Sequence, residues 1–366
     1  MKTESTYFCN YSIGEAPYGE VPAICAPFGS RILLMGGEKA LAAGLPRLLA
    51  ALEGSSLSLE AVETFRGDCT YEAVHVLAKR AKELKVDMIF GMGGGKVLDT
   101  AKGAAYEAKL PVFTFPTICA TCAASTALSV VYKKDGSFDS FYFYERPARH
   151  CFMDLTVIAH APEKYLQAGM GDTIGKYFEC HFAARGDKLS HSSALGREIS
   201  NMCYGPLLEH GEQALLDCRE GRVSSALSEA VLANIISTGL VSLMVLDDYN
   251  CAVAHSVYYG LVLLPGFEEE NLHGNVVAYG VLVQLLLDGE RAEALRLKAF
   301  LTKLGIKTTL KAMGVDLDRQ VLDGVLRDIV TEPDMEHIPY PVTEEMLYEA
   351  MTAVEALAAD ETADGR

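Results

Sequence analysis

Three consecutive glycines, Gly93, Gly94 and Gly95, stand between a short apolar run and a helical pattern, and Lys96 follows them directly. Glycine lets the backbone adopt positive φ angles and approach a ligand closely. A helix start offers unpaired N–H groups and the positive end of the helix dipole, to which the lysine adds a charge. This combination predicts a site for the diphosphate of a nucleotide. An ordinary strand-to-helix turn, with glycine for its geometry alone, is the alternative.

The glycine stretch follows neither of the two common phosphate-binding motifs. A Walker loop requires serine or threonine after its lysine, and this chain has Val97 there. The dinucleotide fingerprint G-x-G-x-x-G would require glycine at position 96, where the lysine stands. The prediction therefore depends on the glycines, the helix start and the lysine together.

An aspartate and two histidines lie in otherwise apolar stretches of the second half: Asp172 in AGMGDTIGKYFE, His255 in AVAHSVYYG and His273 in NLHGNVVAYG. A bare carboxylate or imidazole is costly in such surroundings unless it has a partner. The three side chains could bind a metal ion. Each also has a structural interpretation, as a hydrogen-bonded core histidine or, for the aspartate, as a helix N-cap. Spacing alone does not assemble them, because they are far apart in the sequence.

The composition is that of a globular chain with room for two domains. The chain has 366 residues, of which 50% are hydrophobic and 22% charged. Its net charge of −17 argues against nucleic acid or an anionic membrane as a partner, and it leaves a small-molecule substrate open. The N-terminal residues show no apolar signal core. The uncharged run 230–246 is interpreted as a buried helix, since it is too short and too polar for a membrane span.

Ten cysteines are scattered along the chain without an even framework. This pattern favours free thiols in a reducing cytoplasm. Cys119 and Cys122 have C-x-x-C spacing, but no second pair stands nearby in the sequence, so a redox or zinc motif is not favoured.

The first part of the chain alternates apolar extended runs with helical patterns. Strands are expected at 31–35, 57–65, 86–90 and 111–117, helices at 39–52, 71–84 and after the glycines, a hairpin at 129–144, and a last extended run at 151–158. Such alternation predicts a parallel sheet with crossover helices, in which ligands bind at the carboxyl ends of strands.

Almost everything after Pro162 has helical periodicity. Helices are expected at 162–185, 194–216, 226–246, 251–263 and 276–287. We therefore expect an α/β domain over residues 1–161 and an all-helical domain over residues 162–366.

Five segments resemble, in order and over nearly the whole chain, the glycerol dehydrogenase branch of the iron-containing alcohol dehydrogenases: GMGGGKVLDTAK, FPTICATCAASTALSVVY, AGMGDTIGKYFE, AHSVYYGL and LHGNVVAYG. The resemblance implies a Rossmann-like domain that binds NAD or NADP and an all-helical domain that binds metal and substrate, as in the dehydroquinate synthase-like fold. It also implies hydride transfer between the nicotinamide and a small alcohol or carbonyl substrate. Members of this family commonly form homo-oligomers.

By this resemblance, Asp172, His255 and His273 are the catalytic residues and bind one Zn²⁺ or Fe²⁺ ion, which acts as a Lewis acid on the substrate oxygen. The resemblance assigns the diphosphate region to the glycine stretch and the nicotinamide half to the segment 117–132. The full set of cofactor-binding positions it implies is Gly37, Gly94, Gly95, Lys96, Val97, Asp99, Thr117, Ile118, Ala120, Thr121, Thr126, Leu128 and Tyr132.

The chain departs from the resembled family where the adenosine ribose is bound. Glycerol dehydrogenases usually have an aspartate after the first strand, and this chain has Gly37 there, with Glu38 beside it. Loss of the carboxylate removes repulsion against a 2′-phosphate, which predicts that NADP(H) is used at least as well as NAD(H). Glu38 leaves a preference for NAD(H) open.

Two further departures concern the substrate. Cys122 stands where the polyol enzymes have an aspartate that helps to hold substrate hydroxyls, and a thiol is a poor acceptor for them. Lys176, one helical turn after Asp172, stands where other iron-type enzymes place a metal-binding histidine. Replacing a carboxylate by a thiol and adding an ammonium favours an anionic substrate such as a 2-oxo acid. These variants are similar to the hydroxycarboxylate dehydrogenase subgroup, although Lys176 also fits a solvated helix position.

Three classes of function remain open. The first is a metal-dependent NAD(P)-linked dehydrogenase, acting on small 2-hydroxy acids or, as the alternative, on glycerol and other polyols with NAD. The second is a lyase similar to 3-dehydroquinate synthase, although the basic residues with which that enzyme binds phosphate have no obvious counterpart here. The third is a nucleotide-binding protein that has lost its chemistry, and the intact set of two histidines and an aspartate speaks against it.

Overall fold

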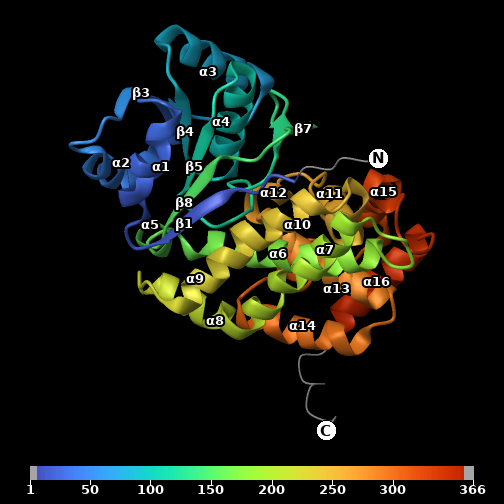
Figure 1. Ribbon diagram of the computed structural model, residues 1–366. Coiled ribbons are helices and arrows are strands. Elements are labelled where there is room, and N and C mark those ends of the chain that lie inside the picture. The colour runs from blue at the N-terminus through green and yellow to red at the C-terminus, as the bar shows by residue number, and fades with distance from the viewer. Residues whose placement is uncertain (1–5, 358–366) are drawn as a thin grey trace. The chain divides into compact units, whose positions relative to one another are not determined.

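The computed structural model describes residues 6–357, and these form two compact units. The first unit contains the described residues up to Leu166 together with Leu216–Leu243. The second contains Gln167–Leu215 and the described residues from Met244 onward. Figure 1 shows the strands within the first unit and an almost entirely helical second unit. Residues 216–243 thus group with the sheet, although they come after the expected boundary at residue 161.

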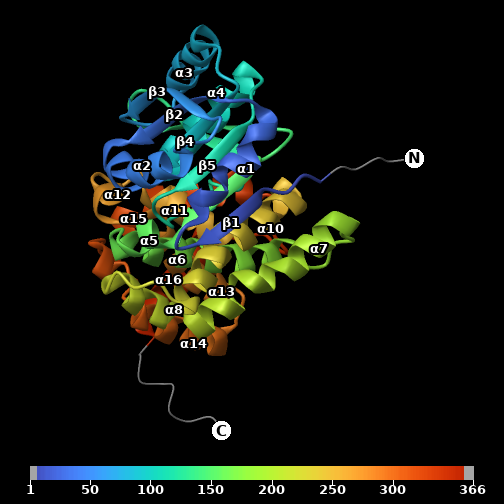
Figure 2. The same ribbon diagram turned by 60° about the vertical axis from the view of Figure 1, so that its left-hand side comes forward.

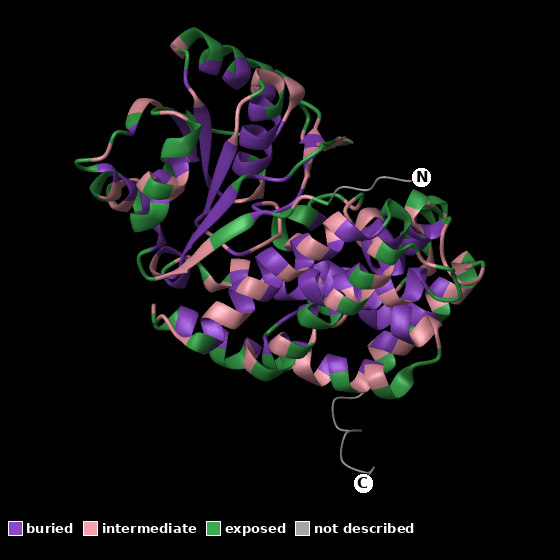
Figure 3. Ribbon diagram, in the orientation of Figure 1, coloured by how far each residue is buried: buried purple, intermediate pink, exposed green. Residues whose placement is uncertain are grey.

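A six-stranded parallel sheet organises the first unit, with the strand order β1-β8-β5-β4-β2-β3. In chain order its strands are β1 (Asn10–Gly14), β2 (Arg31–Gly37), β3 (Ser58–Phe65), β4 (Met88–Gly93), β5 (Val112–Pro116) and β8 (His150–Asp154). The inner strands β4, β5 and β8 are buried along their whole length (Figure 3). The prediction of a parallel α/β sheet is confirmed.

Helices connect the strands, as expected for crossover connections. They are α1 (Val21–Cys25), α2 (Glu38–Leu52), α3 (Tyr71–Leu84) and α4 (Gly95–Ala108), whereas α5 (Leu155–Ala159) follows the last strand; the expected hairpin is formed by β6 (Leu128–Tyr132) and β7 (Phe138–Phe143). The strand order reverses between β2 and β4, which are hydrogen-bonded neighbours with Gly36 opposite Met92. Ligands of open parallel sheets bind at the carboxyl ends of strands beside such a reversal. Gly37 and the glycine stretch both lie at this edge.

The second unit packs its helices around one buried helix, α13. Its helices are the greater part of α6 (Glu163–Ala183), α7 (His191–Ile199), most of α8 (Gly205–Arg219), α11 (Val253–Leu261), α12 (Phe267–Glu270), α13 (His273–Leu287), α14 (Arg291–Lys303), α15 (Arg319–Thr331) and α16 (Glu344–Ala356). Helix α13 is buried without a break from Val276 to Leu285 and packs against α11, α14 and α16 (Figure 2). A helix that is apolar on all sides belongs in the centre of a core.

The uncharged stretch interpreted as a buried helix is formed by α9 (Ser225–Val231), a π-helical segment (Leu232–Ser237) and α10 (Thr238–Met244). Residues 225–244 are long and apolar enough to cross a membrane by length and composition, but 61% of the apolar window is buried inside the protein. Inside the π segment the Asn234 amide donates to the carbonyl oxygens of Cys119 (3.3 Å) and Leu166 (3.5 Å). This burial agrees with a core helix.

Two sequence expectations about elements were wrong, and one strand was not expected. The run 151–158 is not extended throughout, because the Asp154 side chain accepts the N–H groups of Thr156 and Val157 and thereby starts α5. The stretch 194–216 is not one helix: a 3₁₀ turn at Ser200–Cys203 separates α7 from α8. Strand β1 was not expected, since its residues are partly or fully exposed and lack a strand pattern.

Candidate active site

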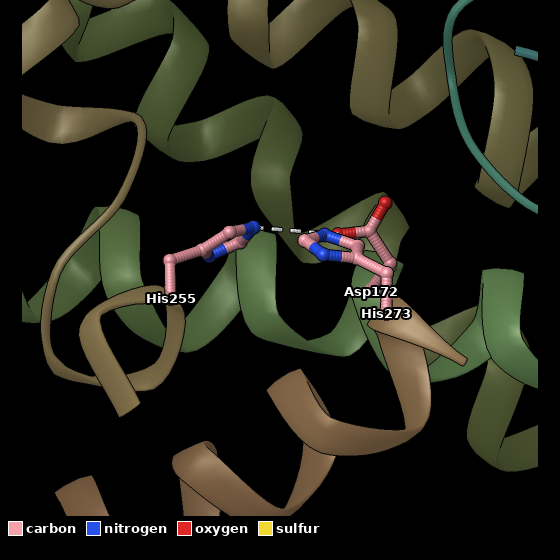
Figure 4. Close-up of side chains that lie close together, drawn as sticks. All are labelled: Asp172, His255 and His273. Atoms are coloured by element: carbon pink, nitrogen blue, oxygen red, sulfur yellow. Dashed lines mark ion pairs between the residues drawn. The ribbon is translucent and has the colours of Figure 1, made fainter. Parts of the chain in front are cut away.

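The three candidate metal ligands come together within the second unit. Asp172 lies on α6, His255 on α11, and His273 is the first residue of α13. The Oδ1 atom of Asp172 is 3.5 Å from Nε2 of His255 and 3.4 Å from Nε2 of His273. One ligand atom from each residue lies within 4.8 Å of the other two. Figure 4 shows the two imidazoles pointing toward the carboxylate from different helices.

Glycine allows the helices to approach closely enough for this arrangement. A Cβ atom on Gly274 would overlap the backbone carbonyl of Ala168, and one on Gly171 would overlap the carbonyl of Gly274. A Cβ atom on Gly280 would in turn overlap the backbone of Ala254. The backbones of α6 and α11 thus touch that of α13 directly, and this contact brings the three ligands to one point.

Glu179 is not one of the three candidate ligands, but it contacts one of them, His255. It lies on α6, is fully buried, and accepts hydrogen bonds from Nδ1 of His255 (2.5 Å) and from the backbone N–H groups of Ala252 (2.7 Å) and His255 (2.8 Å). It therefore caps the start of α11 and holds Nδ1 of the imidazole as a donor, so that in a neutral, metal-binding ring Nε2 is the nitrogen with a free lone pair. Metal-binding histidines commonly have such an outer carboxylate. Sequence reasoning missed Glu179, although it stands seven residues after Asp172 on the same helix face.

The electrostatics of the site favour a positive charge between the carboxylates. Burial raises the pKa of Asp172, but hydrogen bonds to His255 and His273 outweigh it and hold the pKa well below its ordinary value. Burial likewise raises the pKa of Glu179, but the charge of His255 and hydrogen bonds from it lower the pKa overall. Burial lowers the pKa of His255, while Cys251, Glu179 and Asp172 raise it well above its ordinary value. Two imidazole nitrogens and a carboxylate oxygen, with an outer carboxylate in place, fit one Zn²⁺ or Fe²⁺ ion.

Lys176 lies one turn after Asp172 on α6 and is buried, so the interpretation as a solvated helix lysine is wrong. Its ammonium donates to the backbone oxygen (2.5 Å) and to Oδ1 (3.1 Å) of Asn250. Its charge contributes to the lowered pKa of Glu179. Burial raises the pKa of the neighbouring Asp334 carboxyl to about 6. The lysine is therefore a buried cation among the groups that surround the metal ligands.

The first unit presents the glycine stretch at the carboxyl end of β4. Gly93 ends the strand with φ +156°, and Gly94 is the N-cap of α4. As a glycine, Gly94 has no side chain with which to cap the first turn of this helix. A Cβ atom on Gly94 would lie 2.7 Å from the Ile118 side chain, and one on Gly95 would lie 3.4 Å from Thr121. A glycine cradle at an uncapped helix start fits the close approach of a diphosphate.

Lys96 and Tyr132 lie side by side next to this helix start. The Lys96 ammonium is 5.2 Å from the centre of the Tyr132 ring and forms an ion pair with Asp68, which follows β3 in the chain. The lysine side chain is 55% exposed. Its charge is thus accessible near the glycine stretch. Asp68 carries no sequence signal of its own and was not foreseen.

Three of the implied cofactor positions belong to a buried network around Lys102. The Asp99 carboxylate pairs with the Lys102 ammonium (2.9 Å) and accepts the backbone N–H of Val130 (3.1 Å). The same ammonium donates to Oγ1 of Thr126 (3.1 Å) and to the backbone oxygen of Leu128 (2.5 Å). Burial raises the pKa of Asp99, against the influence of Lys102. These hydrogen bonds and the ion pair connect β6 and the residues before it to α4.

The remaining cofactor positions lie along the same edge of the sheet. Thr117 follows β5 and donates its N–H to Gly93 (3.2 Å), and Val97 packs against the same glycine. Gly37 ends β2 and is the N-cap of α2. The partly buried loop residues Ile118, Ala120, Thr121 and Cys122 stand between β5 and β6. Cofactor positions therefore gather in the first unit, and Cys122 lies there too, whereas Lys176 lies in the second.

Comparison with known proteins places the whole chain in one family. The model for iron-containing alcohol dehydrogenases matches residues 10–154. A glycerol dehydrogenase from Citrobacter freundii is 32% identical over 334 residues, which cover 89% of this chain and 87% of that protein. Hydroxycarboxylate dehydrogenase A from Escherichia coli strain K12 is 33% identical over 335 residues, covering 90% of this chain and 91% of that protein. The crystal structure of glycerol dehydrogenase from Schizosaccharomyces pombe shares the fold, with a TM-score of 0.88, 24% identity, and coverage of 98% of this chain and 91% of that chain.

The identity to the Citrobacter freundii and Escherichia coli enzymes extends over 89% and 90% of this chain. It also agrees with the resemblance that the sequence motifs carry. The chain belongs to the iron-containing alcohol dehydrogenase family, and it is an oxidoreductase that acts on alcohol groups with a nicotinamide cofactor and a divalent metal ion.

Proposed function

We propose that the protein interconverts small 2-hydroxy acids and 2-oxo acids. The observation that carries this substrate class is the buried ammonium of Lys176, one turn from the metal ligand Asp172. A buried cation one helical turn from Asp172 attracts a substrate carboxylate, and the thiol of Cys122 offers substrate hydroxyls only a poor acceptor. The 33% identity to hydroxycarboxylate dehydrogenase A supports the same class.

In this proposal residues 162–366 bind metal and substrate, and residues 1–161 bind the cofactor. When bound, the divalent ion supplies a Lewis acid for the substrate oxygen, and the nicotinamide ring gives or takes the hydride. Asp172 supplies an anionic oxygen ligand, and His255 and His273 present Nε2 atoms to the same point. Glu179 keeps the His255 ring in the orientation that this requires. Lys176 holds the substrate carboxylate and thereby orients the carbon that exchanges the hydride.

The positioning of His273 has a second support in this proposal. The Tyr258 ring stands edge-on to the His273 ring, with 4.3 Å between the ring centres. Since His273 is 33% exposed, more than the other two ligands, this contact limits the directions its imidazole can take. We assign the general base to none of the side chains, and the proton of the hydroxyl group leaves through water or cofactor hydroxyls.

The second candidate function is oxidation of glycerol or another polyol with NAD. Glycerol dehydrogenases from Citrobacter freundii and Thermotoga maritima, 32% and 33% identical to this chain, favour it. In that case Cys122 and Lys176 are tolerated variants, and Asp172, His255 and His273 would hold the ion that polarises a substrate hydroxyl. The two candidates share the metal ligands and differ in the charge of the substrate and in the preferred cofactor.

We further infer that NADP(H) serves at least as well as NAD(H), because Gly37 stands where an aspartate would bind the ribose hydroxyls, and the carboxylate of the next residue, Glu38, is paired with Arg66. An efficiency ratio of NADH to NADPH above about ten would contradict this inference. The free cysteines and the negative net charge support a cytoplasmic enzyme without nucleic-acid or membrane partners, and the family supports a homo-oligomer.

A paired assay separates the two candidates. After reconstitution with Zn²⁺ or Fe²⁺, the full chain is supplied with 2-oxobutanoate and NADPH, and separately with glycerol and NAD⁺. Each reaction is followed by the absorbance of the reduced cofactor. We expect efficient NADPH oxidation with the oxo acid and slow glycerol oxidation. Efficient glycerol oxidation without reduction of the oxo acid would contradict the proposal and establish the polyol reaction.

A further inference from the structure

An arginine that the sequence motifs do not include lies beside the strand end that the cofactor's ribose is expected to approach. Arg66 directly follows β3, and the last residue of that strand, Phe65, pairs with Gly37 at the end of β2. Its Nη2 atom is 3.3 Å from Oε2 of Glu38, the first residue of α2. Both side chains are largely exposed, at 81% and 76%. The Arg66 guanidinium therefore lies close to Gly37, the position at which glycerol dehydrogenases usually have an aspartate.

The sheet topology directs the adenosine end of a bound dinucleotide to this place. The glycine stretch follows β4, and β2 is hydrogen-bonded to β4 on the side where the strand order reverses. A dinucleotide whose diphosphate lies at the start of α4 extends from there along the carboxyl edge of the sheet, toward β2 and β3. In doubly wound sheets an acidic side chain near this strand end binds the 2′-hydroxyl of NAD, whereas an arginine accommodates the 2′-phosphate of NADP.

We propose that Arg66 binds the 2′-phosphate of NADP(H) and that Glu38 is its counter-ion in the absence of the phosphate. The phosphate carries a charge of about −1.5 to −2, against −1 for the carboxylate, and offers three acceptor oxygens to the guanidinium fork. An exposed ion pair contributes little to stability, so exchange of one partner for a stronger one costs little. Glu38 remains near the phosphate as a repelling charge and stays favourable at the start of α2. The inference depends on the nicotinamide cofactor of the proposed function and not on its substrate.

An ion pair that involves a residue of β3 provides a matched control. The Arg80 side chain, on α3, pairs with Glu63 of β3 at 2.9 Å. Glu63 pairs with Met35, two residues before the end of β2, so this pair lies away from the carboxyl edge. Arg80→Gln removes the same kind of exposed ion pair and the same charge as Arg66→Gln. An effect of general charge or stability would appear in both variants.

The test is direct binding to the metal-loaded full chain, with no turnover involved. NADPH and NADH are titrated by nicotinamide fluorescence, and 2′,5′-ADP and 5′-AMP, which differ only in the 2′-phosphate, are titrated by calorimetry. For Arg66→Gln we expect about 10- to 100-fold weaker binding of NADPH and 2′,5′-ADP, with NADH and 5′-AMP changed less than about twofold. Glu38→Gln should strengthen NADPH binding about three- to tenfold, since it removes the repelling charge. Arg80→Gln should change none of the four affinities.

Each other result contradicts the inference in a distinct way. If Arg66→Gln leaves NADPH binding within about twofold of the original chain, Arg66 does not bind the phosphate. If it weakens NADH and NADPH equally, its role is structural. If the original chain binds neither cofactor, both the inference and the proposed function are wrong. If it binds both cofactors as expected but reduces no 2-oxo acid, the proposed substrate fails and the role of Arg66 stands.

Discussion

The Glu179 carboxylate lies 2.5 Å from Nδ1 of His255, and the opposite nitrogen of the same ring, Nε2, lies 3.5 Å from the Asp172 carboxylate. All three side chains are buried. A neutral imidazole donates through one nitrogen and accepts through the other, so the bond to Glu179 determines which nitrogen faces Asp172. The geometry of the candidate metal centre thus depends on Glu179, which is not one of its three candidate ligands.

Replacing Glu179 by glutamine should weaken metal binding without removing a ligand. Glutamine keeps the size of the side chain but lacks the charge that polarises the His255 ring, and loss of such an outer carboxylate typically costs about 10- to 100-fold in metal affinity. Competition with a chelator measures the dissociation constant. Glu293→Gln, in a glutamate of the same unit that accepts a hydrogen bond from Tyr204, is the control. An unchanged dissociation constant in Glu179→Gln would show that the ring needs no outer partner.

Gly274→Ala should destabilise the second unit, because the new Cβ would overlap the carbonyl of Ala168 on α6. Forcing these backbones apart should cost about 3 kcal/mol in the free energy of unfolding and reduce metal affinity, since His273 and Asp172 separate. Denaturant unfolding and chelator competition measure the two effects. Gly324→Ala in α15 is the control: within the described residues a Cβ there meets nothing within 4 Å, so alanine should stabilise the helix slightly. Equal behaviour of the two variants would mean that α6 and α13 are not in close contact.

Lys176→Met should raise the KM for 2-oxobutanoate by about tenfold or more, because the buried charge that attracts the substrate carboxylate is lost. The KM for an uncharged diol should change little. Lys298→Met is a matched control, since Lys298 is also buried and donates to two backbone oxygens, those of Val354 and Leu357, both at 2.8 Å. It should affect stability but not the oxo acid KM. An unchanged KM in Lys176→Met would mean that the lysine has only a structural role, through its hydrogen bonds to Asn250.

His150 should make the stability of the first unit depend on pH. It is buried in β8 beside the Ser12 hydroxyl (2.9 Å), and burial lowers its pKa to about 4. Because the unfolded chain has an ordinary histidine pKa of about 6.5, it binds a proton between these values that the folded chain does not bind. The free energy of unfolding is therefore unaffected by His150 above about pH 6.5, and it falls by about 3 kcal/mol as the pH falls toward 4.

Denaturant unfolding at about pH 7 and about pH 4.5 tests this dependence. His150→Gln should lose less stability over the interval than the original chain, and the difference between the two chains is the quantity of interest. His75→Gln removes a histidine whose side chain is 63% exposed and should behave like the original chain. The same loss in all three chains would contradict a role for His150.

The sequence predicted the sheet, and it singled out three candidate metal ligands that the structure brings together, for identifiable reasons. Strands β4 and β5 are short apolar runs flanked by helical patterns, and this periodicity is local information. Asp172, His255 and His273 stand out as polar groups in apolar surroundings, but their meeting depends on helix packing through Gly171, Gly274 and Gly280. From the sequence, only the resemblance to the family indicated that these three residues lie together.

The residues that sequence reasoning missed act through contacts between segments far apart in the chain. Glu179 meets His255 across 76 residues, and Arg66 meets Glu38 across 28. Neither pair has a local pattern, since each side chain by itself is an ordinary helix or loop charge. The break between α7 and α8 was missed for the opposite reason, because the apolar spacing continues through a 3₁₀ turn that the helical period does not reveal.

The most direct test of the metal centre is the metal content of the purified full chain, compared with that of Asp172→Asn. Elemental analysis after reconstitution with Zn²⁺ or Fe²⁺ and removal of loosely bound ions should find one divalent ion per chain. Asp172→Asn, which keeps the shape of the side chain and removes the anionic ligand, should retain almost none. Equal metal content in both chains, or no stoichiometric ion in the original chain, would contradict the assignment of Asp172, His255 and His273 as the metal ligands.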